Sequence, residues 1–425
     1  MPKRLLVLAD IYPPHFAPRA FSLVRYWVNE GWEVAVATEE IVQWNATGHG
    51  KIFEGVEDPC PTYRIPLRRR YDRWESLGEV LFSLKEKHFF RAVESFIDCT
   101  RIDLIVSFSY RTFPHGTAAL LARKYHIPVV MDSRDIIEQY PRYEFLPTLR
   151  GGRSWIKRSL LALLRRRYIK QRNACFQWAD RLVTVSPWHQ QVLQRASQGV
   201  PVSLFYNGYD RTLFFAKRGL KNPRFTITFT GRLLTLTRSN PIPLFQALNS
   251  PELCPILSEG LLEVAWYVDA HSRKLLEEAL RSYPPEILAL QRIRNMIPFR
   301  QVPDLLHQSA MVLLLASPEE EEGAHGIVST KIFEALAVEK PVLMVMSDEA
   351  IGESLLQTAR SGCPAHSIPE IIDYICRCYE QWKSLGYTET VDPNREYIAT
   401  FARDEVARHY TAMLEEVLHP CQNIE

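Results

Sequence analysis

The stretch that most constrains the fold is a polar helix start between two short apolar runs near residue 330. Met311–Ala316 and Val342–Val345 are each long enough for one buried strand. The chain between them has helical spacing, with Ser329 or Thr330 available as the helix cap. Buried strands joined through a helix are the repeating unit of a doubly wound parallel sheet. The sequence therefore predicts an α/β fold.

Lys331 lies in the first turn of this predicted helix, where the helix dipole favours an anion. Glu334 follows three residues later, on the same face as Thr330. A cation, a hydroxyl and free N–H groups at the carboxyl end of a strand favour a phosphate, and a carboxylate one turn later can accept hydrogen bonds from sugar hydroxyls. A solvated helix start with one unfavourable lysine explains the same spacing, so both interpretations stay open.

At 425 residues the chain is long for one domain and sufficient for two. We place a first domain at residues 1–210, a second at 211–390, and a helical C-terminal segment at 391–425. The content of 46% apolar and 24% charged residues is that of an ordinary globular protein. No stretch reaches the ~18 apolar residues of a membrane span. Eight cysteines without CxxC spacing imply no metal site and indicate a reducing, cytoplasmic setting.

Three of the strands predicted in the first half are each followed by a polar loop: Leu5–Ala9, Asp103–Phe108 and Ile127–Met131. The carboxyl ends of parallel strands share one edge of a sheet, so we expect these loops to lie together. None of these loops contains GxGxxG or a P-loop motif. Arg134 can pair with either Asp132 or Asp135 and keep that carboxylate ionised. A structural salt bridge and a role in positioning an acceptor hydroxyl both stay open. The candidates on this edge are Arg19, His115, Asp132, Arg134 and Asp135.

A basic stretch from Leu149 to Asn173 carries nine Lys or Arg residues and no acid. Trp155 and several leucines alternate with the cations at roughly helical spacing. This composition favours an amphipathic helix on an anionic membrane surface. A nucleic-acid interface is not expected, because no stacking surface or known motif accompanies the charge. A solvated basic face is the plainer alternative.

The second half is predicted to open with a strand at Phe225–Arg232. Gly231 lets the backbone approach a ligand there, and Arg232 and Arg238 supply positive charge. A short strand is expected at Met296–Phe299, and helices are expected over 368–385 and 394–418.

Several motifs occur in order along nearly the whole chain, and together they resemble the family-4 retaining glycosyltransferases of the GT-B fold. In the first half they are Tyr12-Pro-Pro with Arg19, Gly31-Trp-Glu-Val, Asp132-Ser-Arg-Asp135, Ala179-Asp180, Val185-Ser-Pro187 and Asn207-Gly-Tyr-Asp210. In the second half they are Thr230-Gly-Arg232, Arg238-Ser-Asn-Pro241, Lys331-Ile-Phe-Glu-Ala-Leu-Ala337 and Lys340-Pro-Val.

The resemblance implies two Rossmann-like domains facing each other across a cleft, with the last helix returning to the first domain. It implies that Glu334 holds the ribose of a nucleotide, and that phosphate contacts surround it. The implied donor-binding residues are Gly231, Arg232, Arg238, Ser329, Thr330, Lys331 and Glu334. The implied catalytic residues are Asp132, Asp135, Arg232 and Lys331, and Arg19, His115 and Arg134 are expected on the acceptor side.

The implied reaction is retaining transfer of a sugar from a UDP- or GDP-sugar to a lipid-linked or polysaccharide acceptor in cell-surface glycan biosynthesis. The chain has no DxD motif, so no metal and no cofactor besides the sugar nucleotide is expected. The implied location is the cytoplasm or, as a peripheral protein, the inner face of the cell membrane.

One departure leaves other functions open. The family often has an acid eight residues before the glutamate, and here that position is Gly326, with Glu319–Glu322 as the nearest replacements. The missing acid makes an inactive GT-B partner subunit one alternative. A nucleotide-sugar epimerase or hydrolase on the same fold is another.

Overall fold

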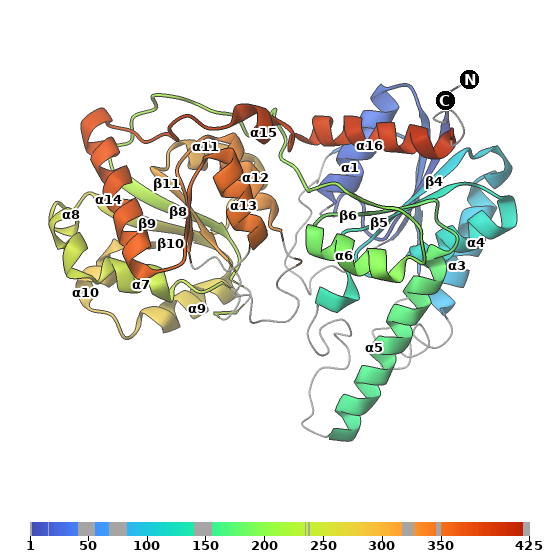
Figure 1. Ribbon diagram of the computed structural model, residues 1–425, viewed down its shortest axis with the longest axis horizontal. Helices are drawn as coiled ribbons and strands as arrows, with labels where there is room; N and C mark the ends of the chain where they lie inside the picture. The colour runs from blue at the N-terminus through green and yellow to red at the C-terminus, as the bar shows by residue number, and fades with distance from the viewer. Residues whose placement is uncertain are drawn as a thin grey trace. The chain divides into compact units, whose positions relative to one another are not determined.

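The computed structural model describes residues 2–15, 17–40, 56–67, 83–139, 155–233, 235–236, 239–316, 326, 328–345 and 350–419. The chain forms two compact units, Met1–Tyr206 with Arg403–Glu425, and Asn207–Ala402. Each unit is a parallel sheet with helices packed on it (Figure 1). This confirms the predicted α/β fold. The second unit extends to Ala402, whereas the sequence-based division starts the returning segment at residue 391.

The first unit contains a seven-stranded sheet in the order β3-β2-β1-β4-β5-β6-β7. All of its neighbouring strands are parallel. The strand order reverses between β1 and β4, and a doubly wound sheet holds its ligands at the carboxyl ends of such a pair. The strands are β1 (Arg4–Ala9), β2 (Glu33–Glu39), β3 (Thr62–Ile65), β4 (Leu104–Ser109), β5 (Val129–Ser133), β6 (Arg181–Thr184) and β7 (Val202–Leu204).

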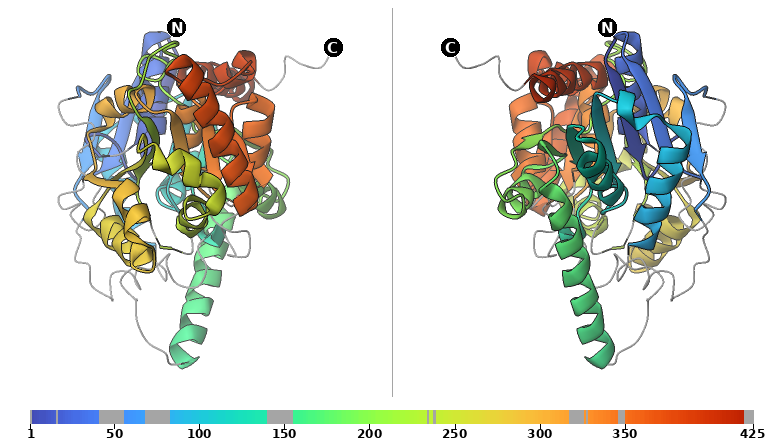
Figure 2. Two further views of the ribbon diagram at one scale, coloured as in Figure 1. Left: turned by 90° about the vertical axis from the view of Figure 1, so that its left-hand side faces the viewer. Right: turned by 90° about the vertical axis from the view of Figure 1, so that its right-hand side faces the viewer.

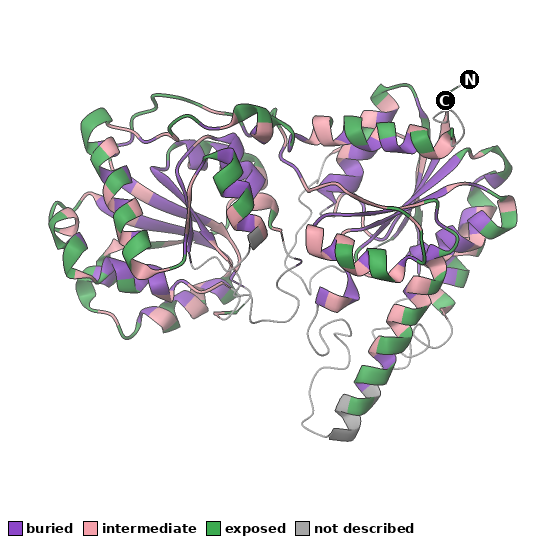
Figure 3. Cartoon of the chain, in the orientation of Figure 1, coloured by how far each residue is buried: buried purple, intermediate pink, exposed green. Residues whose placement is uncertain are grey.

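Two separate hydrophobic clusters show how helices cover both faces of this sheet. One face carries α3 (Leu84–Phe96), α4 (His115–Tyr125), α5 (Trp155–Phe176) and α6 (Pro187–Ala196). The other face carries α1 (Pro18–Asn29) and α16 (Arg403–Leu418). The buried residues gather in the strands and on the inner sides of the helices (Figure 3). The basic stretch forms most of α5, which extends past the other elements of its unit (Figure 2).

The last helix of the chain, α16, belongs to the first unit and completes its core. Trp27 of α1 is fully buried, and its indole Nε1 donates to the Thr411 hydroxyl at 2.9 Å. The Tyr410 ring lies 5.8 Å from the Trp27 ring and 5.0 Å from the Phe205 ring. The returning helix implied by the resemblance is therefore confirmed. The helix predicted over 394–418 is two helices, α15 (Arg395–Ala399) and α16.

The second unit contains a six-stranded parallel sheet in the order β10-β9-β8-β11-β12-β13. The predicted strand at Met296–Phe299 is wrong, because the edge strand β10 ends one residue earlier. Its polar sequence Gln-Arg-Ile-Arg-Asn suits an exposed edge and hides it from a search for apolar runs. The strands are β8 (Phe225–Gly231), β9 (Leu262–Val268), β10 (Gln291–Asn295), β11 (Met311–Leu315), β12 (Val342–Val345) and β13 (Cys363–Ala365).

Aromatic side chains fill the larger core of this unit. Phe225 of β8 meets Tyr379 and Trp382 edge to face at 5.3 and 6.1 Å, and Trp266 of β9 lies 5.4 Å from Phe229. No described helix is long and apolar enough to cross a membrane. The remaining helices are α7 (Ile242–Leu248), α8 (Cys254–Ser258), α9 (Ala270–Leu280), α10 (Pro285–Leu290), α11 (Val302–His307), α12 (Thr330–Ala337), α13 (Ala350–Ala359) and α14 (Ile368–Leu385).

The packing of α16 predicts a large stability effect at Tyr410. Tyr410→Ala should lower the free energy of unfolding by about 3–5 kcal/mol, because it removes a fully buried ring between Trp27 and Phe205. Denaturant unfolding of the full chain measures this, and His409→Ala on the exposed side of the same helix should stay within about 0.5 kcal/mol of the wild type. Equal effects of the two substitutions would show that α16 is not part of the core.

Candidate functional site

In the second unit, the strand order reverses between β8 and β11, and the residues predicted to bind a donor follow these two strands. Gly231 ends β8, and α12 begins at Thr330 after β11. Ser329 caps the helix, because its side chain accepts a hydrogen bond from the Lys331 N–H at 3.3 Å. The helix therefore starts where the sequence predicts.

Gly231 and Lys331 are brought together although they are a hundred residues apart in the chain. A Cβ added to Gly231 would collide with Nζ and Cε of Lys331. Gly231 also has a φ of +128°, which an L side chain rarely adopts. The Lys331 ammonium lies 5.0 Å from the centre of the Phe229 ring. The lysine side chain thus lies against the backbone at the end of β8, and only glycine leaves room for it.

Burial lowers the pKa of Lys331 to about 8, since water no longer stabilises its charge. Glu334 raises the pKa and partly offsets the burial, whereas the positive charge of Arg232 lowers it further. The charged form of Lys331 is therefore less stable at this sheet edge than it would be in water. A bound anion would remove that cost, which is the electrostatic condition for a phosphate site.

Arg232 follows Gly231 and is fixed at the same edge. Its Nε lies 3.2 Å from Oδ2 of Asp269, which also caps α9 by accepting from the Ser272 N–H at 2.8 Å. Burial opposes ionisation of Asp269, but the hydrogen bonds from Ser272 and the charge of Arg232 outweigh it and lower its pKa. The ion pair anchors the guanidinium beside the end of β8.

Glu334 is 7% exposed on α12, one turn beyond Lys331. Thr330 is half-buried and Ser329 is exposed. Gly326 is described and buried, whereas Arg238 and Glu319–Glu322 lie outside the described residues. The structure therefore brings together Gly231, Arg232, Lys331 and Glu334 of the predicted donor set.

In the first unit, Asp132 and Arg19 form a buried ion pair. Nε of Arg19 lies 2.9 Å from Oδ2 of Asp132, and the two side chains are 6% and 0% exposed. Arg19 also donates to the carbonyls of Phe205 at 2.9 Å and Tyr206 at 3.2 Å. Burial, together with the negative charge of Asp132, raises the pKa of Tyr410 well above its usual value. This cluster ties α1, β5 and α16 together.

The prediction that Arg134 pairs with Asp132 or Asp135 is wrong. The Arg134 guanidinium lies 3.6 Å from Asp10 after β1, and it acts on Asp135 only at longer range. Asp135 accepts a hydrogen bond from Gln139 at 2.5 Å, and burial raises its pKa. The neighbour in sequence is not the partner because β5 lies beside β4 and near β1, which brings other charges closer.

His115, predicted on the acceptor side, is fully buried between two strands. Its Nδ1 lies 2.8 Å from the Ser107 hydroxyl and its Nε2 lies 3.0 Å from the Ser133 hydroxyl. Burial, with a smaller contribution from Arg172, lowers its pKa to about 3. It is a neutral residue that links β4 to β5, and we interpret it as structural.

Asp10 is the site residue that the sequence reasoning missed. It is 8% exposed at the end of β1, and its carboxylate accepts from the N–H groups of Ile11 at 2.8 Å and Tyr110 at 2.7 Å. Burial raises its pKa to about 6 in spite of Arg134 and these N–H groups. The signal for it in the sequence was its place directly after the first buried strand, on the edge where the other candidates lie.

Within the described part of the chain, no group of three or more His, Cys, Asp or Glu residues is placed to hold a metal ion. Carboxylates at the two sheet edges have other partners: Asp269 pairs with Arg232, Asp132 pairs with Arg19, and Asp10 accepts a hydrogen bond from the Tyr110 N–H.

The structure is similar over nearly its whole length to several solved proteins. Sucrose-phosphate synthase from Thermosynechococcus elongatus matches with a TM-score of 0.64 and 12% identity, over 98% of this chain and 100% of that one. HepE of Anabaena, in complex with UDP, matches with a TM-score of 0.63 and 14% identity, over 97% and 100%. A putative UDP-N-acetylglucosamine 2-epimerase from Listeria monocytogenes matches with a TM-score of 0.56 and 11% identity, over 100% and 99%. At these identities the likeness shows the fold alone.

Sequence comparison adds one family. Residues 17–208 match the model of the glycosyl transferase 4-like domain. No curated protein matches the chain in sequence. The matched region covers α1 through β7, which is nearly all of the first sheet. Residues 17–208 therefore form a glycosyl transferase 4-like domain, and the chain as a whole has the GT-B fold of the solved proteins that it matches.

Proposed function

We propose that this protein transfers a sugar from a nucleotide-sugar to a lipid-linked or polysaccharide acceptor, with retention of the anomeric configuration. The observation that carries the proposal is the placement of Lys331 against Gly231, beside Arg232, at the start of α12. A half-buried cation with a lowered pKa at a helix start suits the diphosphate of such a donor.

The donor would lie along the carboxyl edge of the second sheet. Lys331 and the Ser329 end of α12 would hold the phosphates, and Arg232 would add charge from the end of β8. Glu334, one turn deeper, would accept hydrogen bonds from the ribose hydroxyls. Negative charge grows on the leaving diphosphate during transfer, so these cations would stabilise the transition state more than the ground state.

UDP is the nucleotide that we favour. HepE of Anabaena, which shares the fold, has been crystallised with UDP, with UDP and glucose, and with UDP-glucose. Among the described residues, the proposed donor contacts involve the phosphates and the ribose and do not select the base. GDP is therefore the competitor to test beside UDP.

On the acceptor side, the first sheet offers Asp10 and Asp135 at the ends of β1 and β5. Burial raises the pKa of both carboxyls, which suits groups that accept a hydrogen bond from a hydroxyl and exchange its proton. Asp132, by contrast, is enclosed with Arg19 and lies out of reach of solvent. We therefore assign Asp132 and Arg19 to positioning of the sheet edge and α16.

The donor assignment predicts that either of two conservative substitutions weakens nucleotide binding. Lys331→Gln removes the cation and leaves a neutral side chain that is one atom shorter. Glu334→Gln removes the carboxylate charge and keeps the length of the side chain. Each should weaken UDP binding by at least about tenfold, because an interaction with a charged group is worth about 1.5–3 kcal/mol. Isothermal titration with UDP and GDP measures this.

The control for these variants is Lys274→Gln, at an exposed position on α9 of the same unit. It should bind UDP as the wild type does. If Lys331→Gln and Glu334→Gln bind as tightly as Lys274→Gln, the donor site lies elsewhere. Incubation of the wild type with UDP-sugar alone tests the competing epimerase or hydrolase function, since complete conversion without an acceptor would favour that function.

The lowered pKa of Lys331 predicts that UDP binding weakens with rising pH. Below a pH of about 8 the lysine is charged and can bind the diphosphate, and above it the free protein must first take up a proton. Between about pH 7 and about pH 9 the dissociation constant should rise by roughly tenfold. The Lys331→Gln variant should lose this dependence and keep only the titration of the nucleotide itself. A wild-type affinity that is constant over this range would contradict the role of the lysine.

We further propose that α5 holds the protein against an anionic membrane, as its lack of acids and its cations other than the buried Arg172 favour. Vesicles that contain anionic lipid should carry the protein in flotation, and neutral vesicles should not. Charge reversal at Arg166, Arg167 and Lys170 should abolish the association, because each cation contributes about 1 kcal/mol near the surface. Reversal of three exposed cations of the second unit, Lys274, Arg281 and Arg300, is the matched control. Equal flotation with neutral vesicles would sink the idea.

A further inference from the structure

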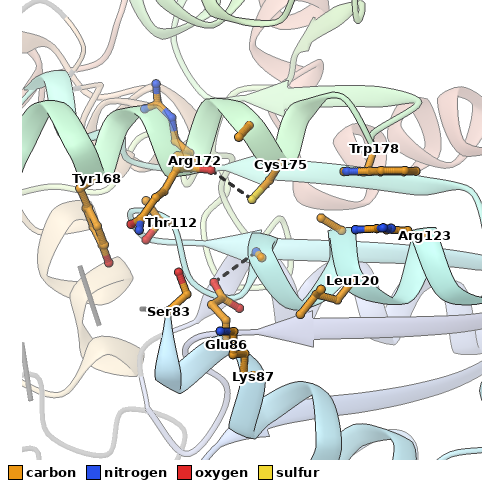
Figure 4. A pocket seen from close by; sticks show the side chains of 14 residues that line it. Ser83, Glu86, Lys87, Thr112, Leu120, Arg123, Tyr168, Arg172, Cys175 and Trp178 are labelled. Carbon is orange, nitrogen blue, oxygen red and sulfur yellow. Dashed lines mark hydrogen bonds between the residues drawn. The ribbon is translucent and has the colours of Figure 1, made fainter. Parts of the chain in front are cut away.

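A groove between α4 and α5 of the first unit has no part in the sites described above. Its volume is about 240 Å³, and the start of α3 closes one side of it (Figure 4). On α4 it is lined by Gly116, Ala119, Leu120 and Arg123, which occupy one face of the helix at the i, i+3, i+4 and i+7 positions. The groove therefore runs along the helix and is elongated.

The floor of the groove is made of small and apolar groups. Gly116 has no side chain, Ala119 and Ala174 present single methyl groups, and Leu120 adds a larger apolar surface. The Cys175 thiol also faces the groove, but it donates to the carbonyl of Gln171 at 3.3 Å. This strip of small and apolar groups suits a hydrocarbon chain. The lining is completed by four neutral polar residues, Ser83, Thr112, Tyr168 and Gln171.

Two positively charged side chains, Lys87 and Arg123, lie at the rim of the groove. Both are exposed and form no ion pair with another described residue. The Arg123 guanidinium lies 5.9 Å from the ring of Trp178, which is itself 40% exposed. Figure 4 shows Arg123 beside Trp178, with Lys87 lying near Glu86. These two cations are thus available to a negatively charged head group.

The two other charged groups of the lining are already compensated. Arg172 makes two hydrogen bonds of 2.7 Å to the carboxylate of Glu138. Glu86 accepts from the N–H groups of Gly116 at 3.2 Å and Thr117 at 2.8 Å, and from the Thr117 hydroxyl at 2.8 Å. Because these donors belong to the start of α4, the helix dipole also balances the Glu86 charge. The net field at the groove therefore favours an anion.

We propose that this groove binds an anionic amphiphile, with its hydrocarbon chain along the floor and a phosphate or carboxylate head facing Lys87 and Arg123. The site is independent of the proposed sugar transfer, and it differs from surface attraction of α5 because it takes up one molecule. A membrane lipid and a soluble phosphate ester share this chemistry, so the test must separate the chain from the head.

Isothermal titration with octyl phosphate, below the concentration at which it forms micelles, tests the proposal on the full chain. We expect one molecule to bind. Inorganic phosphate, which lacks the chain, and octyl glucoside, which lacks the charge, should each bind at least about tenfold more weakly. Octyl glucoside that binds equally well would overturn the charged head group, and phosphate that binds equally well would leave only an anion site. The absence of octyl phosphate binding would overturn the proposal.

Two variants and their matched controls locate the binding. Ala174→Trp should fill the groove from an exposed position of α5 and abolish octyl phosphate binding, whereas Ala162→Trp, exposed elsewhere on α5, should not. Arg123→Gln should weaken binding by at least about tenfold, whereas Arg166→Gln should not. All four should bind UDP as the wild type does, so a failure here is distinguishable from a failure of the donor assignment. Wild-type affinity in Ala174→Trp, with retained stability, would exclude this groove.

Discussion

Removing a charged side chain from water costs free energy, and this cost determines how the charges at both sheet edges are paired. A buried ion without a partner loses several kcal/mol, so a folded chain must either pair it or leave it for a ligand. In the first unit the pairing is internal, as Arg19 with Asp132 shows. In the second unit Arg232 has Asp269, but Lys331 keeps a lowered pKa even with Glu334 nearby. The incompletely compensated positive charge of Lys331 is the feature that suits a phosphate.

The same constraint explains which parts of the site could be predicted from the sequence. Lys331 and Glu334 lie on one helix, so their spacing alone places them together, and the capping of α12 by Ser329 follows from local rules. The partner of Asp132 could not be found this way. Arg19 lies 113 residues earlier, and only the packing of α1 over β5 brings the two together. Arg134 is only two residues from Asp132 in sequence, but it pairs with Asp10.

The fold, like the start of α12, was predictable because local sequence patterns mark its central elements. Buried central strands such as β1 and β11 are continuous apolar runs, and the pattern of the sequence marks them without reference to the rest of the chain. The edge strand β10 has partly exposed polar residues, so its assignment depends on hydrogen bonds to β9 that no local pattern reports. The break between α15 and α16 also coincides with the boundary of the second unit at Ala402, which is a property of the tertiary structure.

Asp10 and Lys331 give the two units a common electrostatic design. Each lies where the strand order of its sheet reverses, and burial moves each pKa toward neutrality, to about 6 for the carboxyl and about 8 for the ammonium. Burial of Asp10 outweighs the charges of Arg134 and Lys85, and the N–H groups that donate to its carboxylate are neutral. A fold that needed these groups only for stability would do better with neutral side chains. Their presence at these two places is better explained by a polar ligand than by folding.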